Sequence, residues 1–361
     1  MARPTQAHLD LGALRHNISH ARALAPQSKV MAVVKANAYG HGAVTIAKAL
    51  EPLADALAVA SIDEALQLRS AGISAPILLL EGIFQREEIA IAATEKLWLC
   101  IDNEWQLACL EKEKLKRPIP AWLKIDTGMH RLGIDPASAS AVYQRLKNSP
   151  NVADDIVLCT HFACADDLES RQTQQQINQF ETVCKALPGE RSAANSAGLL
   201  GWAQAHYDWV RPGYMLYGNS PFTASHPNTE ALRPVMTLNS NIISIRDVNA
   251  GEPVGYGAIW RASKPSRIAT VAIGYGDGYP RLARNGTPVL VNGQRATLAG
   301  RVSMDMITID VTGLGGVTQG DEVILWGKDL PLAEIAECAG TIGYELTTRM
   351  PARTPRIVSN S

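Results

Sequence analysis

The chain has 361 residues, more than one ordinary domain needs, and its length predicts two domains. Hydrophobic residues make up 46% of it and charged residues 19%, as in a globular protein with a large buried interior. Lys and Arg together number 34 against 35 Asp and Glu, so no excess charge exists to gather nucleic acid or an acidic membrane surface. We therefore expect a small-molecule ligand, no nucleic acid and no membrane.

The N-terminus and the cysteines bear on the cellular compartment. Polar residues interrupt the N-terminal segment before any apolar run of signal-peptide length, and no apolar run reaches the roughly 18 residues that a membrane helix needs. The six cysteines form no CxxC pair, which favours free thiols over a disulfide or zinc framework. We expect a cytoplasmic protein.

Residues 1–228 alternate short apolar runs with amphipathic segments, at a spacing typical of βα units. The eight runs are 30–34, 56–60, 77–80, 97–101, 122–125, 156–159, 192–194 and 208–210. Helix signals lie between and before them: Asp10 as an N-cap, Ser61 with Glu64 as a capping box, Pro136 at a first helical position and Gly72 as a C-terminal stop. Eight such units predict a (β/α)8 barrel, for which about 250 residues are typical.

A polar stretch at 218–231 contains two prolines and no periodicity, and we interpret it as a linker. Short β-branched runs follow it, at 235–245, 268–273, 287–291, 296–298, 306–311 and 322–325. Turn signals at 249–251 and at Asn292-Gly293 separate the runs, and 332–339 has a helical pattern. We predict a mostly β C-terminal domain at 229–361.

Polar residues lie at or after the ends of five of the barrel runs, at the end where barrel enzymes carry their reacting groups. They are Lys35, Lys124 and Asp126, His161, Asn195 and Ser196, and Arg211. A single polar residue at a strand end is most simply explained by its contact with water. Five strand ends together favour a site, because partly desolvated ionisable groups cost free energy unless function or pairing compensates.

Lys35 is the candidate nucleophile. A lysine beside apolar walls and other cations loses proton affinity and can form a Schiff base near neutral pH. Pyridoxal phosphate needs such a lysine, a phosphate cradle and a partner for its ring nitrogen. Tyr39, Ser196 and the Gly213-Tyr214 backbone are candidates for the phosphate, and Arg211 for the ring.

Nine motifs cover nearly the whole chain and, in order and spacing, resemble those of the alanine racemases. They are VMAVVKANAYGHG, LKIDTGMHRLG, THFACAD, ANSAG, WVRPGYMLYG, VGYGAIW, IGYGDGYPR, GRVSMDM and GYEL. One difference is Ser303, where many relatives have cysteine before the Met-Asp pair. The resemblance implies a pyridoxal-phosphate-dependent isomerase that interconverts L- and D-alanine, either to supply peptidoglycan or in alanine catabolism.

The resemblance also implies roles for individual residues. Lys35 would hold the cofactor and be the base for D-alanine, and Tyr256 would be the base for L-alanine on the opposite face. Since Tyr256 and Met304 belong to the C-terminal domain, a homodimer is implied in which each chain completes its partner's site. Arg131 and the Met304 backbone N–H would hold the substrate carboxylate, with Asp305 beside them. The remaining implied cofactor contacts are Tyr39, His161, Asn195, Ser196, Arg211, Gly213, Tyr214 and Tyr344, and the implied substrate corridor is Asp166, Tyr275, Arg281 and Arg301.

The chemistry of Arg211 and His161 narrows the reaction further. A guanidinium does not readily give a proton to the ring nitrogen, so the ring would be a weak electron sink, which discourages transamination. His161 with Lys124 resembles half of a two-metal hydrolase site, but the His-x-His of such sites is missing from the first strand, and we expect no metal. The resemblance implies instead that His161 links Arg211 to Tyr256, and that Lys124 can be carbamylated to orient Arg131.

Two other functions remain open on the sequence. A decarboxylase of ornithine or diaminopimelate type would share the barrel, the β domain and the cofactor, but it would use a catalytic cysteine and an acidic partner where Arg211 stands. A non-catalytic pyridoxal-phosphate carrier would be a lone barrel, and the segment 229–361 argues against it.

Overall fold

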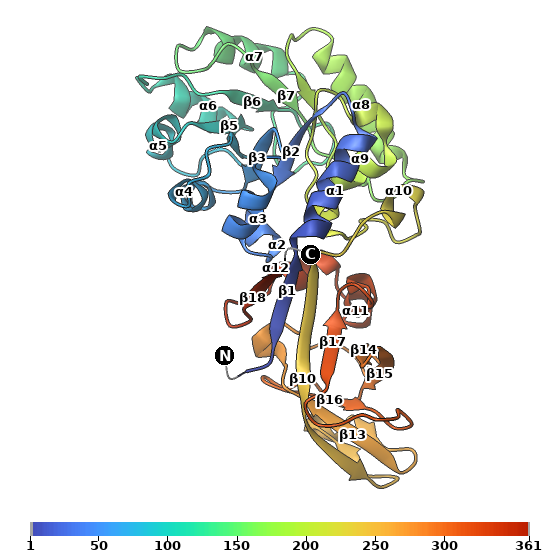
Figure 1. The fold of residues 1–361 in the computed structure, drawn as a ribbon. Coiled ribbons are helices and arrows are strands. Elements are labelled where there is room, and N and C mark those ends of the chain that lie inside the picture. The colour runs from blue at the N-terminus through green and yellow to red at the C-terminus, as the bar shows by residue number, and fades with distance from the viewer. Residues whose placement is uncertain (1–2, 360–361) are drawn as a thin grey trace. The chain divides into compact units, whose positions relative to one another are not determined.

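The computed structural model describes residues 3–359 and divides the chain into two compact units. The barrel unit comprises Arg15–Ala38 and Ala43–Leu232, and the β unit comprises Met1–Leu14, Tyr39–Gly42 and Arg233–Ser361. Figure 1 shows the elements of both units in chain order. None of the helices within residues 3–359 combines the length and the apolar composition that a membrane span requires.

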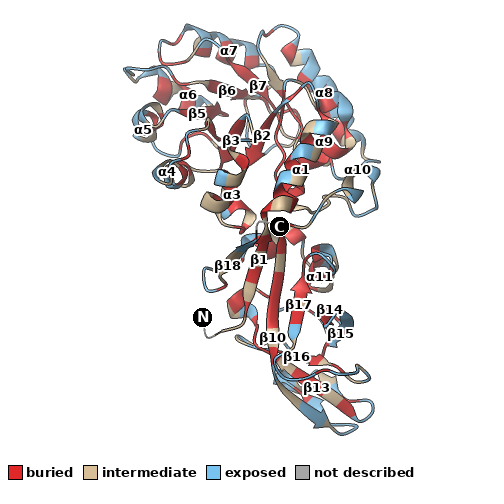
Figure 2. Ribbon diagram, viewed as in Figure 1, coloured by how far each residue is buried: buried red, intermediate tan, exposed pale blue. Residues whose placement is uncertain are grey.

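Eight parallel strands close into a barrel, which confirms the predicted fold class and all eight apolar runs as strands. The strands are β2 (Lys29–Val33), β3 (Ala56–Val59), β4 (Ile77–Leu79), β5 (Leu97–Ile101), β6 (Ala121–Lys124), β7 (Val157–Cys159), β8 (Arg191–Ser192) and β9 (Trp209–Val210). Figure 2 shows buried residues along these strands, as expected where helices cover a parallel sheet.

The helices of the barrel alternate with its strands. They are α1 (Leu11–Leu24), α3 (Ala43–Leu50), α4 (Ile62–Ser70), α5 (Glu88–Thr94), α6 (Glu104–Glu111), α7 (Ala139–Asn148), α8 (Arg171–Cys184), α9 (Ser196–Gly201) and α10 (Pro227–Glu230), with the single turns η1 (Ala203–Ala205) and η2 (Tyr214–Tyr217). The predicted cap of α1 is confirmed, because the Asp10 carboxylate accepts the Ala13 N–H at 2.8 Å.

Two helix-start predictions are wrong. Ser61 is the N-cap of α4 but makes no side-chain cap bond, and the Glu64 carboxylate accepts from Ala60 and Ala36 instead. Pro136 does not start a helix; it lies in a turn closed by the Ser138 N–H and the Asp135 carbonyl, and α7 begins at Ala139. At Glu64, contacts with neighbouring segments outweigh the local capping signature.

The barrel interior is packed with side chains. The rings of Trp98, Trp122 and Trp209 come from three different strands and meet with centroids 5.5 to 6.4 Å apart. The thiols of Cys100 and Cys159 lie 4.0 Å apart, and all six cysteines of the chain are free. Since the barrel is a filled core, its chemistry is confined to its ends.

The β unit is built on an eight-stranded sheet in the order β13-β16-β15-β14-β17-β10-β1-β18. The strands are β1 (Gln6–Asp10), β10 (Met236–Val248), β13 (Ser266–Val271), β14 (Pro288–Val291), β15 (Gln294–Leu298), β16 (Ile307–Asp310), β17 (Glu322–Trp326) and β18 (Arg356–Ser359), and β11 (Pro253–Val254) pairs with β12 (Trp260–Arg261). All six predicted runs are strands, and the helix predicted at 332–339 is α11 (Leu332–Cys338). β1, which was not predicted, lies between β10 and β18 (Figure 1).

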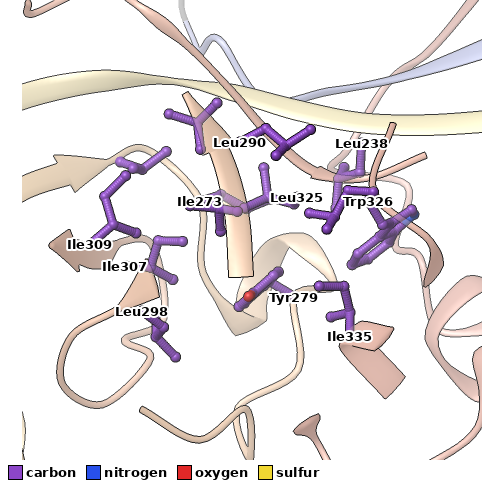
Figure 3. Packing of buried hydrophobic residues seen from close by; sticks show 14 of the residues in the cluster. Leu238, Ile273, Tyr279, Leu290, Leu298, Ile307, Ile309, Leu325, Trp326 and Ile335 are labelled. Atoms are coloured by element: carbon purple, nitrogen blue, oxygen red, sulfur yellow. The ribbon is translucent and has the colours of Figure 1, made fainter. Parts of the chain in front are cut away.

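The core of the β unit lies between this sheet and its helices. Leu238, Ile273, Leu325 and Trp326 are among its buried residues, and Ile335 of α11 packs onto the same cluster (Figure 3). The Asn292-Gly293 turn joins β14 to β15 with both residues at positive φ, 50° and 76°, which confirms the predicted tight hairpin. Gly40 is required by close approach, since a Cβ there would lie 1.8 Å from the Thr347 carbonyl oxygen of α12 (Gly343–Thr348).

Candidate active site

The ends of the barrel strands bring the predicted polar residues to one mouth. Lys35 follows β2, Lys124 ends β6, His161 follows β7 and Arg211 follows β9. Burial lowers the pKa of Lys35, and the charges of Arg131 and Lys124 lower it further. The site therefore favours the neutral, nucleophilic amine that the sequence predicted at this position.

Two carboxyl groups at the same mouth were not predicted. Glu81 follows β4, and its charge is the largest influence that opposes the lowered pKa of Lys35. Asp102 follows β5 and is 3% exposed; burial raises its pKa, while Lys124 acts in the opposite direction. The register pairs Ile101 of β5 with Leu123 of β6. Asp102 and Lys124 are the next residues on each side and therefore lie next to each other. Both acids directly follow predicted apolar runs, so the signal that found Lys35 was available for them as well.

His161 is neutral at physiological pH. Burial lowers its pKa well below 6.5, and the charges of Arg211 and Lys124 act in the same direction. Its backbone carbonyl accepts a hydrogen bond from Gln176 Nε2 at 3.0 Å. A neutral imidazole can donate from one ring nitrogen and accept at the other, as a hydrogen-bond relay requires.

His161 makes the stability of the protein depend on pH. Its folded pKa lies below the unfolded value near 6.5, so the unfolded state binds more protons as the pH falls through 6.5. We expect the wild type to lose stability relative to a His161→Asn variant by up to about 1.4 kcal/mol per pH unit below about pH 6.5. Urea unfolding at several pH values measures this difference. Parallel pH profiles for the two proteins would contradict it.

Arg211 is buried and held by neutral acceptors. Its Nη1 donates to Ser192 Oγ at 2.5 Å, and its Nη2 donates to the Thr160 and Ala193 carbonyls at 2.7 and 3.2 Å. Within residues 3–359 it has neither a carboxylate partner nor a hydrogen bond to the His161 ring. Burial lowers its pKa. The guanidinium is thus fixed with its charge unpaired, ready to face a ligand.

The loop after β8 and the loop after β9 meet at Ser196. The Ser196 hydroxyl accepts the Gly213 and Met215 N–H groups at 3.0 and 3.2 Å, which joins the predicted cradle residues directly. Asn195 caps α9, since its side chain accepts the Gly198 N–H at 2.9 Å. Burial raises the pKa of the adjacent Tyr214.

Gln176, a fully buried amide on α8, holds two site loops together and was also not predicted. Its Nε2 donates to the His161 carbonyl and to Thr127 Oγ1, and its Oε1 accepts the Ala163 N–H at 2.9 Å. Thr127 and Thr160 share a hydroxyl hydrogen bond of 2.7 Å. This network connects the loop that carries the exposed Arg131 with the loop that carries His161. A glutamine on the apolar face of α8 was the signal in the sequence.

The remaining predicted residues, apart from Asp166, lie in the β unit, mostly on three loops. Tyr256 opens the turn η3 (Tyr256–Ala258) and is 70% exposed. The Tyr275 N–H donates to the Ser303 carbonyl at 3.0 Å, and the Gly276 N–H donates to the Met304 carbonyl at 2.8 Å, so η4 (Tyr275–Asp277) and the Met304 loop lie together.

Other contacts support these loops. Arg353 binds the carboxylates of Asp277 and Asp305, and Asp277 is buried. The rings of Tyr39 and Tyr344 lie 6.2 Å apart, and burial raises the pKa of Tyr39 to about 12. The predicted corridor residues are all exposed or partly exposed: Asp166 in the barrel unit, and Tyr275, Arg281 and Arg301 in the β unit.

A (β/α)8 barrel with a desolvated lysine at its C-terminal mouth, followed by a β domain, defines a lysine-dependent barrel enzyme. The chain belongs to the alanine racemase family: the N-terminal domain of that family matches residues 9–221 and its C-terminal domain matches residues 235–358.

Relatives of known name agree over the whole length. The alanine racemase of Pseudomonas taetrolens is 52% identical over 98% of both chains, and the biosynthetic alanine racemase of Escherichia coli is 49% identical over 94% of this chain and 95% of its own. The crystal structure of the biosynthetic alanine racemase from Pseudomonas aeruginosa has a TM-score of 0.96 and 48% identity, covering 99% of this chain and all of its own. The crystal structure of the alanine racemase from Bartonella henselae, with covalently bound pyridoxal phosphate, has a TM-score of 0.90 and 32% identity, covering 99% of this chain and all of its own.

Proposed function

We propose that this protein is a pyridoxal-phosphate-dependent alanine racemase that interconverts L- and D-alanine. The observation that carries the proposal is the partly buried Lys35 at the barrel mouth, with a pKa lowered by burial and by two neighbouring cations. Such an amine can attach the cofactor aldehyde near neutral pH. Family membership supports the isomerase assignment.

The residues at the mouth fit pyridoxal phosphate. The loops that carry Ser196 and Gly213 meet as a polar cradle for a phosphate, and the unpaired charge of Arg211 suits a ring nitrogen that stays unprotonated. Lys35, Arg211, His161, Asn195, Ser196, Gly213 and Tyr214 of the barrel, with Tyr39 and Tyr344, would hold the group. When bound, the cofactor supplies an electron sink for the negative charge that develops at the substrate Cα.

The chain's own residues then move the proton. Racemisation needs a base on each face of the substrate, because a proton removed from one face has to be returned to the other. Lys35 takes or returns the proton on the D-alanine face, and Tyr256 does so on the L-alanine face. Arg131 and the Met304 N–H bind the substrate carboxylate, supported by Lys124 and Asp305. The neutral ring of His161 relays hydrogen bonds without adding charge to a mouth that already holds several cations.

The site requires a homodimer, with Tyr256 and Met304 reaching the partner's barrel. Large exposed hydrophobic side chains on loops of the β unit support this arrangement, since clustered exposed apolar groups are typical of an interface. They are Tyr256, Ile259, Tyr275, Leu282, Met304 and Met306, with exposures of 39 to 76%.

The direct test is to incubate the purified protein with pyridoxal phosphate and L-alanine and to measure D-alanine by chiral chromatography. We expect the mixture to approach equal amounts of the two enantiomers, because they have equal free energy in water. A decarboxylase would instead release carbon dioxide, and a carrier would leave L-alanine unchanged. An L-alanine solution that stays enantiopure would refute the proposal.

A further inference from the structure

The backbone directly after Lys35 has an unusual conformation. Ala36, Asn37 and Ala38 have φ of 52 to 54° and ψ of 46 to 54°, so the segment α2 (Lys35–Tyr39) contains a left-handed turn. Alanine rarely adopts this conformation, because its Cβ approaches the following carbonyl oxygen. Consecutive residues persist there only when their surroundings determine the backbone.

The Glu64 carboxylate makes a short hydrogen bond to the backbone of this left-handed turn. Its Oε1 accepts the Ala36 N–H at 2.6 Å, and its Oε2 accepts the Ala60 N–H at 2.8 Å. One side chain of α4 therefore connects the segment after β2 with the segment after β3. Both are charge-assisted hydrogen bonds, which are shorter and stronger than neutral ones.

The turn has a second attachment on its other side. The Asn37 side chain accepts the Ala43 N–H at 2.8 Å, where α3 begins, and the Ala38 N–H donates to the Val34 carbonyl at 2.9 Å. Asparagine tolerates the left-handed region better than alanine does. Within residues 3–359, however, the Ala36 N–H has one acceptor, the Glu64 carboxylate, and Ala36 is the residue next to Lys35.

We propose that Glu64 is a positioning residue for Lys35: its carboxylate holds the left-handed turn and thereby fixes the direction in which the lysine side chain leaves the end of β2. This inference rests on the proposed function, in which Lys35 carries the cofactor. It explains why Glu64 departs from the capping box that its sequence position predicts. A carboxylate engaged in ordinary helix capping would accept the Ser61 N–H instead.

The test compares Glu64→Gln with Asp63→Asn in the full-length protein. The Glu64→Gln substitution keeps the size of the side chain, but the new amide group faces one of the two N–H donors and leaves it unsatisfied. Asp63 is the neighbouring, exposed acid of the same helical turn, so Asp63→Asn removes one negative charge from that turn of α4 without touching the left-handed turn. Spectroscopic titration with pyridoxal phosphate and peptide-resolved hydrogen exchange are measured on both variants and on the wild type.

We expect Glu64→Gln to weaken cofactor binding and to speed amide exchange in the peptide that contains Ala36, each by about tenfold, with a matching loss of kcat/KM. Asp63→Asn should match the wild type in all three measurements. Should Glu64→Gln fail to fold, Glu64→Asp, which keeps the charge but cannot reach both donors, is expected to show the same changes.

Two outcomes would overturn the proposal. One is unchanged exchange at Ala36 and unchanged cofactor affinity in Glu64→Gln. The other is faster exchange confined to α4, which would assign Glu64 to helix capping. The exchange measurement needs no cofactor, so it tests the role of Glu64 in holding the turn even if the wild type binds no pyridoxal phosphate. A wild type that binds no pyridoxal phosphate would refute the proposed function separately.

Discussion

Replacing Lys35 with alanine is expected to lower the rate of D-alanine formation by about 10³-fold or more and to remove the visible absorption band of the lysine-bound cofactor. The physical reason is that Lys35 is a partly buried amine at the barrel mouth whose pKa is lowered by burial, which favours the neutral, nucleophilic form. Lys124 lies at the same mouth, but it is the last residue of β6, whereas Lys35 lies beyond the end of β2. We do not expect Lys124 to substitute for Lys35.

The matched control is Lys114→Ala, which removes an exposed lysine from a loop of the barrel unit. It should retain wild-type activity and absorption. Thermal unfolding of both variants separates loss of chemistry from loss of fold. A Lys35→Ala protein that folds normally and still racemises alanine would disprove the role of this lysine.

Mixed dimers provide the second large effect. A Lys35→Ala chain and a Tyr256→Phe chain should each be inactive as homodimers. If Tyr256 serves the partner's barrel, a mixed dimer regains one complete site, built from Lys35 of one chain and Tyr256 of the other. Random pairing makes about half the dimers mixed, so co-expression should restore about a quarter of the wild-type sites.

The activity of the mixed dimer depends on whether Tyr256 acts on the partner's barrel or on the barrel of its own chain. If Tyr256 acts on the barrel of its own chain, a mixed dimer contains no complete site and activity stays at background. Two differently tagged chains, purified in sequence, yield pure mixed dimers with about half the wild-type activity. The Lys35→Ala chain paired with wild type serves as the control for dimer assembly.

The barrel could be predicted from the sequence because buried parallel strands appear as continuous apolar runs, and runs such as 97–101 carry that signal without help from distant residues. The positions of Lys35 and Arg211 at the barrel mouth could be predicted because they directly follow such runs. Glu81 and Asp102 obey the same rule, so their positions at the mouth are predictable in the same way. Tyr256 followed only from the family resemblance, since an exposed tyrosine in a short turn has no chemical signature of its own.

Other features depend on contacts between distant segments, and no local pattern encodes them. The left-handed turn contains two alanines, which give no sign of positive φ, and its anchor Glu64 lies 28 residues from Ala36. The capping-box prediction was wrong for the same reason, because the Glu64 carboxylate accepts hydrogen bonds from the Ala36 and Ala60 N–H groups, which lie outside α4. β1 was not predicted because it is short and its partners, β10 and β18, lie more than 200 residues away.

The position of β1 has a consequence for synthesis on the ribosome. β1 fills an interior position of the β sheet, yet it is synthesised before the barrel residues, and its neighbours β10 and β18 are synthesised only after them. Nascent β1 therefore waits with its backbone donors unpaired while the barrel folds, and its pairing has a high contact order, which slows folding. A fragment that begins in the linker would lack β1. A contiguous piece of the chain that contains all eight strands of the sheet must therefore contain the barrel as well.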